Sequence, residues 1–187
     1  MNKRTETLLK KAGWYEGKKI DISNIVKIYE ESGKEVFPKA KQYLEEFGNI
    51  IIYTKSIVDR KKMIPFHILD VEYLFERGYY EGLARQLELT LGEKVLKIGA
   101  TSGYENHLYI SESGNFYDSF GFVGNDIYEC LDIILETVSL EERYSRTKSW
   151  DEMGIEQKLD EAEQKLFAED PQGDKGIEFY NYLSGLS

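Results

Sequence analysis

Gly13-Trp14-Tyr15-Glu16-Gly17-Lys18 follows a short helical pattern at residues 5–12, and Tyr43-Leu44-Glu45-Glu46-Phe47-Gly48-Asn49-Ile50 joins a longer helical pattern to a run rich in β-branched residues. A glycine directly after a helical pattern ends the helix, because glycine adopts the left-handed backbone conformation at low cost. The second stretch therefore predicts a helix that ends at Gly48 and a strand over residues 49–54. A helix that is followed directly by a strand implies helices packed on a sheet.

Two further helical patterns precede that strand. Apolar residues recur at helical spacing after Asp21 and Ser23, either of which suits the N-cap of a helix that stops at Gly33. Pro38 then suits the first turn of the helix that ends at Gly48. Each of these helices shows one apolar face, so we expect both to pack on a common core.

A second strand is predicted at residues 63–69. Because proline donates no ladder hydrogen bond, Pro65 makes this an edge strand or an irregular one. Asp70 is suited to cap a helix directly after it. Gly78 and Gly82 weaken the helical pattern that follows, so we expect the pattern to break into two helices.

The second half has the rhythm of an antiparallel meander. Short segments separated by Gly, Ser and Asn predict strands at residues 94–100, 107–111, 115–118 and 121–123. Glu112-Ser113-Gly114-Asn115 is the clearest hairpin turn, and Asn125 or Asp126 caps a helix whose apolar stripe includes Cys130. These patterns predict an α+β fold, an antiparallel sheet packed with several helices. Its expected core includes Leu44, Phe47, Ile98, Leu108, Ile110, Leu131 and Ile134.

The C-terminal region differs in composition from the rest of the chain. Residues 145–187 hold ten acidic and five basic side chains, yet four apolar residues recur every three or four positions at Ile155, Leu159, Ala162 and Leu166. This spacing predicts a narrow amphipathic helix, which we expect to fold back on the preceding domain, although a partner could use the same stripe. We therefore predict a domain over residues 1–144 and an acidic helical extension over residues 145–187.

Composition limits the classes of function. The 187 residues carry a net charge of -10, which repels phosphate backbones and favours a basic partner, although ordinary solubility explains the same charge. A single cysteine excludes an intramolecular disulfide, and no run approaches the roughly 18 apolar residues that a membrane span needs. We therefore expect a cytoplasmic protein, a monomer or weak dimer, that binds neither nucleic acid nor membrane.

The order and spacing of several short motifs resemble the third family of the SUKH superfamily. The resemblance begins at Gly13-Trp14 and Phe47-Gly48, and it continues through Ile98-Gly99, Leu108-Tyr109-Ile110 and the helix after Asn125-Asp126, roughly residues 7–140. It differs from the family at Lys18-Lys19, where an arginine is common. The superfamily is known mostly for bacterial immunity proteins encoded beside polymorphic toxins, and its fold is a single α+β domain. The resemblance implies that this chain binds a cognate toxin and blocks its active site.

The residues themselves indicate no catalytic centre. The only imidazole and thiol groups are His67, His107 and Cys130, too few at too wide a spacing for a zinc site, so no metal and no cofactor is expected. Gly99-Ala100-Thr101-Ser102-Gly103 lacks the lysine and the following helix of a phosphate loop. We interpret Cys130 as a core residue and His107 as an ordinary strand residue, and we predict that the chain is not an enzyme.

The predicted partner-binding residues are Glu72, Glu76, Tyr79, Tyr80 and Tyr104. Carboxylates steer a protein toward a basic cleft, such as that of a nuclease or another toxin that acts on nucleic acid, and tyrosine rings add contact area at low entropic cost. The same tyrosines could instead pack against the sheet. The alternative function is a regulatory interaction module, because fungal cell-wall regulators of the same superfamily act as hubs. An enzyme of unrecognised type is a third hypothesis.

Overall fold

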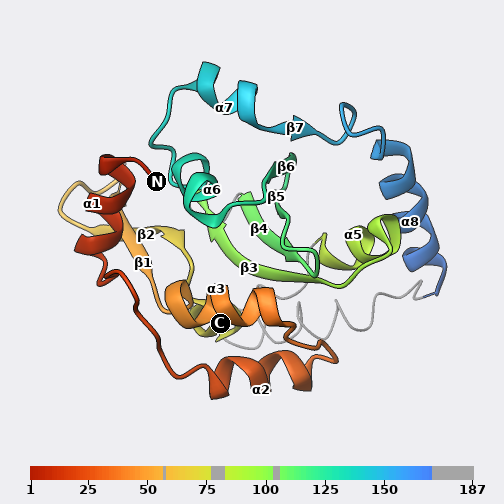
Figure 1. Cartoon of the computed structure of the whole chain (residues 1–187), viewed down its shortest axis with the longest axis horizontal. Helices are drawn as coiled ribbons and strands as arrows, with labels where there is room; N and C mark the ends of the chain where they lie inside the picture. The colour runs from red at the N-terminus through yellow and green to blue at the C-terminus, as the bar shows by residue number, and fades with distance from the viewer. Residues whose placement is uncertain (57, 77–82, 103–105, 170–187) are drawn as a thin grey trace.

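A computed structural model describes residues 1–56, 58–76, 83–102 and 106–169 (Figure 1). These residues form eight helices and seven strands, which confirms the predicted α+β fold. The helices are α1 (Lys3–Lys11), α2 (Ser23–Glu31), α3 (Pro38–Phe47), α4 (Val71–Glu76), α5 (Ala84–Leu91), α6 (Ile127–Ile134), α7 (Leu140–Arg146) and α8 (Glu156–Glu169). The strands are β1 (Ile51–Lys55), β2 (Met63–Ile68), β3 (Val95–Thr101), β4 (Asn106–Ser111), β5 (Phe116–Asp118), β6 (Gly121–Gly124) and β7 (Lys148–Ser149).

The strands form one antiparallel sheet in which each strand lies beside the next in sequence. The predicted turn between β4 and β5 is confirmed. Its Gly114 has a φ of 91°, a conformation that favours glycine, and the N–H of Ser111 donates to the carbonyl oxygen of Asn115 across 2.9 Å. A continuous meander places the ends of β4, β5 and β6 side by side, where they build the site described below.

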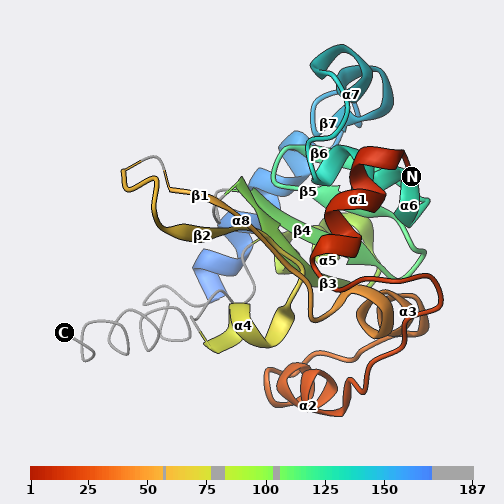
Figure 2. The same cartoon turned by 90° about the vertical axis from the view of Figure 1, so that its left-hand side faces the viewer.

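One face of the sheet is covered by α1, α2, α3 and α6 (Figures 1 and 2). Because side chains alternate along a strand, Leu96 and Ile98 of β3 and Leu108 and Ile110 of β4 point into this layer. All seven residues expected in the core are buried, which confirms them: Leu44, Phe47, Ile98, Leu108, Ile110, Leu131 and Ile134.

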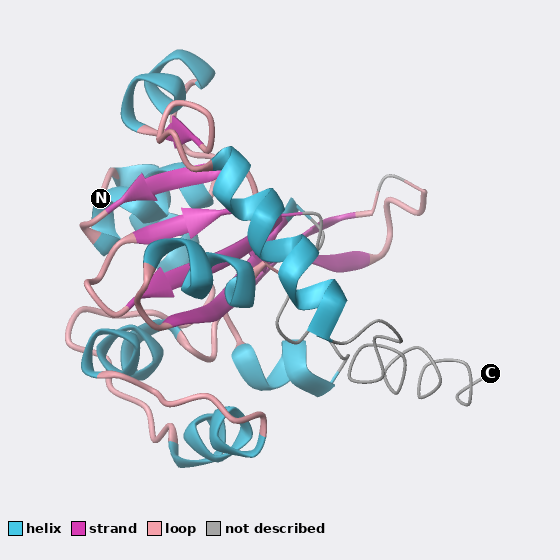
Figure 3. Ribbon diagram, turned by 90° about the vertical axis from the view of Figure 1, so that its right-hand side faces the viewer, coloured by secondary structure: helices cyan, strands magenta, loops and turns pink. Residues whose placement is uncertain are grey.

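The opposite face is covered by α5 and α8, which cross in front of the strands in Figure 3. Tyr109 of β4 and Tyr117 of β5 point into this second cluster, where they meet Leu87 of α5 and Leu159 of α8. The amphipathic helix expected near the C-terminus is therefore present. Its stripe is buried at Leu159, which joins the second cluster, and at Ala162.

Local capping follows the expected residue at α4 but not at α2. Asp70 accepts a hydrogen bond of 2.9 Å from the N–H of Tyr73 in α4. In α2 the N-cap is Ile22, which makes no capping hydrogen bond, so the expected cap at Asp21 or Ser23 is wrong; Asp21, one residue earlier, accepts a hydrogen bond of 2.9 Å from the N–H of Ser23. The pairing of β1 with β2 is irregular where Tyr53 faces Pro65, as Pro65 predicts. The expected two helices are present as α4 and α5, while Gly78 and Gly82 lie outside the described residues.

The sequence patterns missed α7 and β7. Strand β7 has two exposed residues, and it joins the sheet because Gly121 of β6 allows close approach: a Cβ atom at Gly121 would lie 2.0 Å from the carbonyl oxygen of Lys148. After α7 the chain thus adds β7 as the last strand of the sheet, and α8 then packs on the face that α5 covers. The division at residue 144 falls within α7 and stays a prediction.

Candidate functional site

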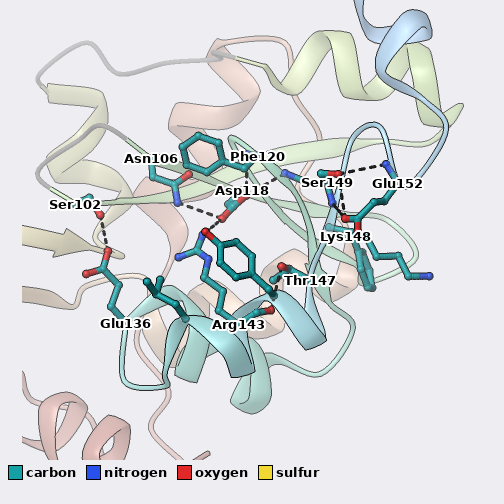
Figure 4. Close-up of a pocket in the computed structure, with 14 residues that line it drawn as sticks. Ser102, Asn106, Asp118, Phe120, Glu136, Arg143, Thr147, Lys148, Ser149 and Glu152 are labelled. Atoms are coloured by element: carbon teal, nitrogen blue, oxygen red, sulfur yellow. Dashed lines mark hydrogen bonds and ion pairs between the residues drawn. The ribbon is translucent and has the colours of Figure 1, made fainter.

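A pocket of about 680 Å³ lies where the ends of β4, β5 and β6 meet α7 and β7 (Figure 4). Its lining includes Asn106 of β4, Asp118 of β5 and Gly121 of β6 on the sheet side. Arg143 of α7 and Ser149 of β7 line the opposite side. The pocket therefore joins the meander to the segment that crosses back toward α8.

The floor of the pocket is a saturated polar network centred on Asp118. One carboxylate oxygen accepts from Asn106 Nδ2 at 3.2 Å and from the Arg143 guanidinium at 2.8 Å, and the other accepts from the N–H groups of Phe120 at 2.8 Å and Gly121 at 3.1 Å. Asp118 is 4% exposed, and a buried ion pair of this kind is held in place by its additional hydrogen bonds. The network fixes α7 to the sheet and gives the pocket a rigid base.

One wall joins two residues with uncommon backbone conformations. Ser102 has a φ of 52° and Glu136 a φ of 54°, the only positive values among the described residues other than glycines. The Ser102 hydroxyl donates a hydrogen bond of 2.7 Å to the Glu136 carboxylate, which links the end of β3 to the segment after α6 (Figure 4). Such conformations cost about 1 to 3 kcal/mol each and gather at ligand-binding sites, so this wall agrees with a functional surface.

Three apolar side chains stand exposed around the opening. Phe120, Leu140 and Tyr144 are 64%, 70% and 73% exposed, and we call them the rim. The Phe120 backbone is held by Asp118, and Tyr144 follows directly after Arg143, which binds the same carboxylate. Large apolar side chains on a fixed backbone are the usual anchors of protein interfaces, because little conformational entropy is lost on binding.

The β7 side of the pocket carries charge. Glu152 accepts hydrogen bonds from both the N–H of Ser149, at 2.8 Å, and its hydroxyl, at 3.0 Å, and these two bonds lower the pKa of Glu152. The carboxylate is thus ionised near neutral pH. Lys148 lies beside it with its side chain exposed, so the opening offers both signs of charge around an apolar rim.

Cys130 and His107, two side chains with potential reactivity, have different surroundings in the structure. Burial raises the pKa of the Cys130 thiol to about 12, and its side chain lies in the core, which confirms it as a core residue. His107 is half-buried, with its Nδ1 atom 3.4 Å from the Tyr109 hydroxyl. Within the described ranges, no three His, Cys, Asp or Glu side chains gather closely enough to hold a metal ion.

The predicted binding residues lie elsewhere. Glu72 is half-buried on α4 and lines a cleft between α2 and α4 together with Lys27 and Glu31. Glu76 is the last residue of the same helix, one turn further on. The other three predicted residues, Tyr79, Tyr80 and Tyr104, lie outside the described residues. Glu72 and Glu76 thus belong to one short helix.

The sequence carries a signal for α7, one wall of the pocket. Ser139 precedes α7 and accepts a hydrogen bond of 3.2 Å from the N–H of Glu142, so Ser139-Leu140-Glu141-Glu142 carries the Ser-x-x-Glu pattern of a helix start. That pattern would have revealed α7. The pairing of Arg143 with Asp118, 25 residues away, has no counterpart in local sequence.

Comparison with known proteins gives one match. A family model described as SUKH-3 immunity protein matches residues 1–137, whereas no curated protein and no solved structure matches the chain. In the part of the chain that the structure describes, no helix has the length and apolar character needed to cross a membrane. The matched region supplies the meander and the sheet side of the pocket, while α7 and β7 follow it. The match covers well over half of the chain, and the chain therefore belongs to the SUKH-3 immunity protein family.

Proposed function

We propose that this chain binds one cognate toxin domain and neutralises it by occluding the toxin's active site or substrate path, without chemistry of its own. The observation that carries the proposal is the exposed rim around a rigid polar floor, in a chain of an immunity protein family. An immunity protein must recognise its toxin tightly, and tight interfaces depend on a few large, fixed, apolar side chains.

The rim meets that requirement. Phe120, Leu140 and Tyr144 are exposed, while the backbone beneath Phe120 is held by two N–H groups that donate to Asp118. A side chain on such a backbone does not have to be ordered when the partner arrives, so more of the contact energy is retained as affinity. The 680 Å³ pocket behind the rim has room for a side chain that projects from the toxin.

The charge of the chain suggests the kind of toxin. A net charge of -10 attracts a positively charged partner and speeds its association. Toxins that cleave or modify nucleic acid need basic substrate clefts to bind phosphate. We therefore propose that the cognate toxin acts on nucleic acid and that this chain covers its cleft in the cytoplasm, where such a toxin meets its substrate.

The polar groups of the pocket support binding in place of catalysis. Both oxygens of Asp118 and the Arg143 guanidinium are engaged with each other and with fixed neighbours, and a saturated carboxylate is poorly placed to exchange protons with a substrate. The hydrogen bonds that Glu152 accepts from Ser149 likewise hold it as a stable anion. We propose that these groups shape the surface.

A second contact surface remains a proposal. Glu72 and Glu76 lie together on α4, and Glu72 lines a cleft with Lys27. Tyr79, Tyr80 and Tyr104 belong to the same proposal from the sequence. In this view the rim anchors the toxin, and the carboxylates of α4 guide it during approach.

Co-expression with a toxin domain encoded by a neighbouring gene tests the proposed function. Cells that produce the toxin should survive only when this chain is present. The double variant Phe120→Ser, Tyr144→Ser should raise the dissociation rate of the complex by about 100-fold, because two interface anchors are removed. The control is Tyr15→Ser, Phe167→Ser, which removes two equally exposed aromatic rings at other places on the surface.

The outcomes separate the alternatives. Equal killing with and without this chain would contradict the immunity function and favour a regulatory interaction module. Protection that survives the rim variant but fails in the control would place the toxin on another surface. Loss of protection upon replacing a single carboxylate, with toxin binding unchanged, would point to an enzyme.

A further inference from the structure

The hairpin of β1 and β2 extends beyond the helical layers. Figures 2 and 3 show it projecting from the body of the protein. Tyr53, Met63 and Ile64 are 49%, 56% and 39% exposed, although Met63 and Ile64 are neighbours and therefore point to opposite faces of the sheet. Both faces of the hairpin are thus open to solvent. We call Tyr53–Ser56 together with Val58–Ile64 the arm.

The outer edge of the arm is unpaired. Strand β1 is the first strand of the sheet, and no described strand pairs with its outer side. Ser56 and Lys62 form a hydrogen-bonded pair, because the N–H of Ser56 donates to the carbonyl oxygen of Lys62 across 2.9 Å. Thr54, two residues before Ser56, lies opposite Ile64. Because hydrogen-bonded and non-hydrogen-bonded pairs alternate in an antiparallel ladder, the backbone groups of Tyr53 and Lys55 point away from β2. An added strand could pair with these groups.

The arm has the opposite charge to the rest of the chain. Residues 51–64 contain Lys55, Arg60, Lys61 and Lys62 against a single acidic residue, Asp59, in a chain whose net charge is -10. Two local hydrogen bonds hold the tip. The Asp59 carboxylate accepts one of 3.1 Å from the N–H of Lys61, and the backbone carbonyl oxygen of Asp59 accepts one of 2.9 Å from the N–H of Lys62. The basic side chains are therefore presented by an ordered turn.

These features select one kind of occupant. A second copy of the chain would bring two basic arms together, which like-charge repulsion opposes. A nucleic acid that reached the arm would meet a strongly acidic body. A protein strand with acidic side chains satisfies both the open backbone groups and the charge, and its apolar residues would cover Tyr53 and Met63.

We propose that the arm binds an acidic segment of the cognate toxin by strand addition, pairing it along the outer edge of β1. This inference rests on the proposed function, because the occupant is the toxin. The arm supplies a contact separate from the rim, at the opposite end of the sheet from β7. The acidic body would then attract the basic cleft of the toxin while the arm recognises an acidic strand beside it.

Two matched pairs of variants test the proposal with the full chain and the adjacent toxin domain. Tyr53→Pro removes an N–H group that faces away from β2, a position where an edge strand tolerates proline, while Tyr53→Ala removes the ring but keeps the N–H. Relative to Tyr53→Ala, the proline variant should weaken toxin binding by about tenfold, because it removes a backbone bond and obstructs strand pairing. Circular dichroism and thermal unfolding establish that both variants remain folded.

The second pair tests the charge of the arm. Lys61→Glu with Lys62→Glu should lower the association rate at low salt by about tenfold. Lys11→Glu with Lys19→Glu makes the same change in net charge at exposed positions away from the arm and should have a smaller effect. Together the two pairs separate backbone pairing from charge.

Each outcome decides the proposal. Loss in both arm variants with both controls retained supports strand addition. Unchanged binding in both arm variants overturns it, and if the rim variant still releases the toxin, the proposed function stands. Loss from the lysine reversal alone, with Tyr53→Pro equal to Tyr53→Ala, overturns strand addition in favour of a side-chain contact. A wild-type chain that does not bind the toxin overturns the proposed function and this inference together.

Discussion

Phe47 joins the helical layer to the sheet through an aromatic cluster. Its side chain is fully buried, and its ring centroid lies 5.5 Å from that of Tyr43 and 6.3 Å from that of Trp14, with which it stacks. The Trp14 indole donates a hydrogen bond of 3.0 Å to Glu46 on the same helix as Phe47. The stretch around Trp14 is therefore in direct contact with the end of α3 around Phe47.

Replacing Phe47 with alanine should lower the free energy of unfolding by about 3 to 5 kcal/mol, because a cavity remains that the rigid aromatic neighbours cannot fill. Urea unfolding measures the change. Phe120→Ala is the matched control, because Phe120 is largely exposed and its loss should change stability by less than about 0.5 kcal/mol. Equal midpoints for the wild type and Phe47→Ala would show that the cluster does not hold the helices to the sheet.

His67 of β2 should make stability depend on pH. Burial lowers the pKa of His67 to about 4, against about 6.5 in an unfolded chain, while Glu136 acts weakly in the opposite direction. Between these values the unfolded state binds a proton that the folded state does not. The stabilisation is therefore complete above pH 6.5 and is lost as the pH falls toward 4.

Urea unfolding at pH 7 and pH 5 tests this dependence. His67 should account for a loss of about 2 kcal/mol between these two values. In the variant His67→Asn, which does not titrate, the fall in stability should be smaller by that amount. An identical fall in both proteins would mean that other groups, such as surface carboxylates, cause the dependence.

At the level of secondary-structure elements, α8 illustrates how the C-terminal region relates to the rest of the molecule. Its Leu159 packs in a cluster with Leu87 of α5 and with Tyr109 and Tyr117 of the sheet. An acidic helix thus covers apolar sheet residues through a narrow stripe, while its charged residues face solvent. The stripe thus adds to the cover that α5 provides on this face.

Leu159→Ala should destabilise the protein by about 2 kcal/mol or more, because a buried leucine is lost from a packed cluster. Phe167→Ala, on the same helix but 69% exposed, should leave the melting temperature nearly unchanged. Thermal unfolding should show a single transition in both variants. A separate early transition, or no effect of Leu159→Ala, would mean that α8 folds independently of the sheet.

The elements that the sequence predicted are those in which local pattern and tertiary structure agree. Pro38, Gly114 and Asp126 each mark a boundary through their own backbone or side-chain chemistry, and each lies where it was expected. Gly48 also lies at the expected helix end, but its φ of -65° is right-handed; a Cβ atom there would lie 2.5 Å from the carbonyl oxygen of Leu44. Strand β7 has no such pattern. Its two residues are exposed, and they pair with β6 because Gly121, 27 positions earlier, leaves room for their backbone.

The candidate site was less predictable for the same reason. Asp118, Arg143 and Asn106 are ordinary polar residues in sequence, and only the fold brings them within hydrogen-bonding distance. Glu72 and Glu76, which the sequence predicts as binding residues, belong to the same helix, α4, at a spacing of one helical turn. Helical spacing can be deduced from local sequence, whereas a pocket assembled from β4, β5, α7 and β7 depends on long-range packing.

At the level of the whole molecule, charge is unevenly distributed. The chain carries -10 overall, while residues 51–64 at one end of the sheet are basic. The electrostatic field of a charged partner therefore turns such a protein toward one orientation before the two make contact. We therefore expect charge to control how fast the toxin associates and apolar contacts at the rim to control how slowly it leaves.

The dependence of binding kinetics on salt tests this division. Raising the salt concentration from about 0.03 M to about 0.3 M shortens the screening length from roughly 18 Å to roughly 6 Å. The association rate should then fall by about tenfold or more, while the dissociation rate should change by less than about threefold. Stopped-flow mixing with the toxin domain measures both. An association rate that is insensitive to salt would show that charge does not guide the encounter.

Charge reversal shows where on the surface that guidance acts. Two double variants change the net charge equally. The first is Glu72→Lys with Glu76→Lys on α4, and the second is Glu156→Lys with Asp160→Lys on α8. In each, the two residues are one helical turn apart. If α4 faces the basic cleft, its reversal should slow association at low salt by several-fold more than the reversal on α8, because steering depends on the charges nearest the contact. Equal slowing by the two reversals would assign the effect to net charge alone and remove Glu72 and Glu76 from the proposed binding surface.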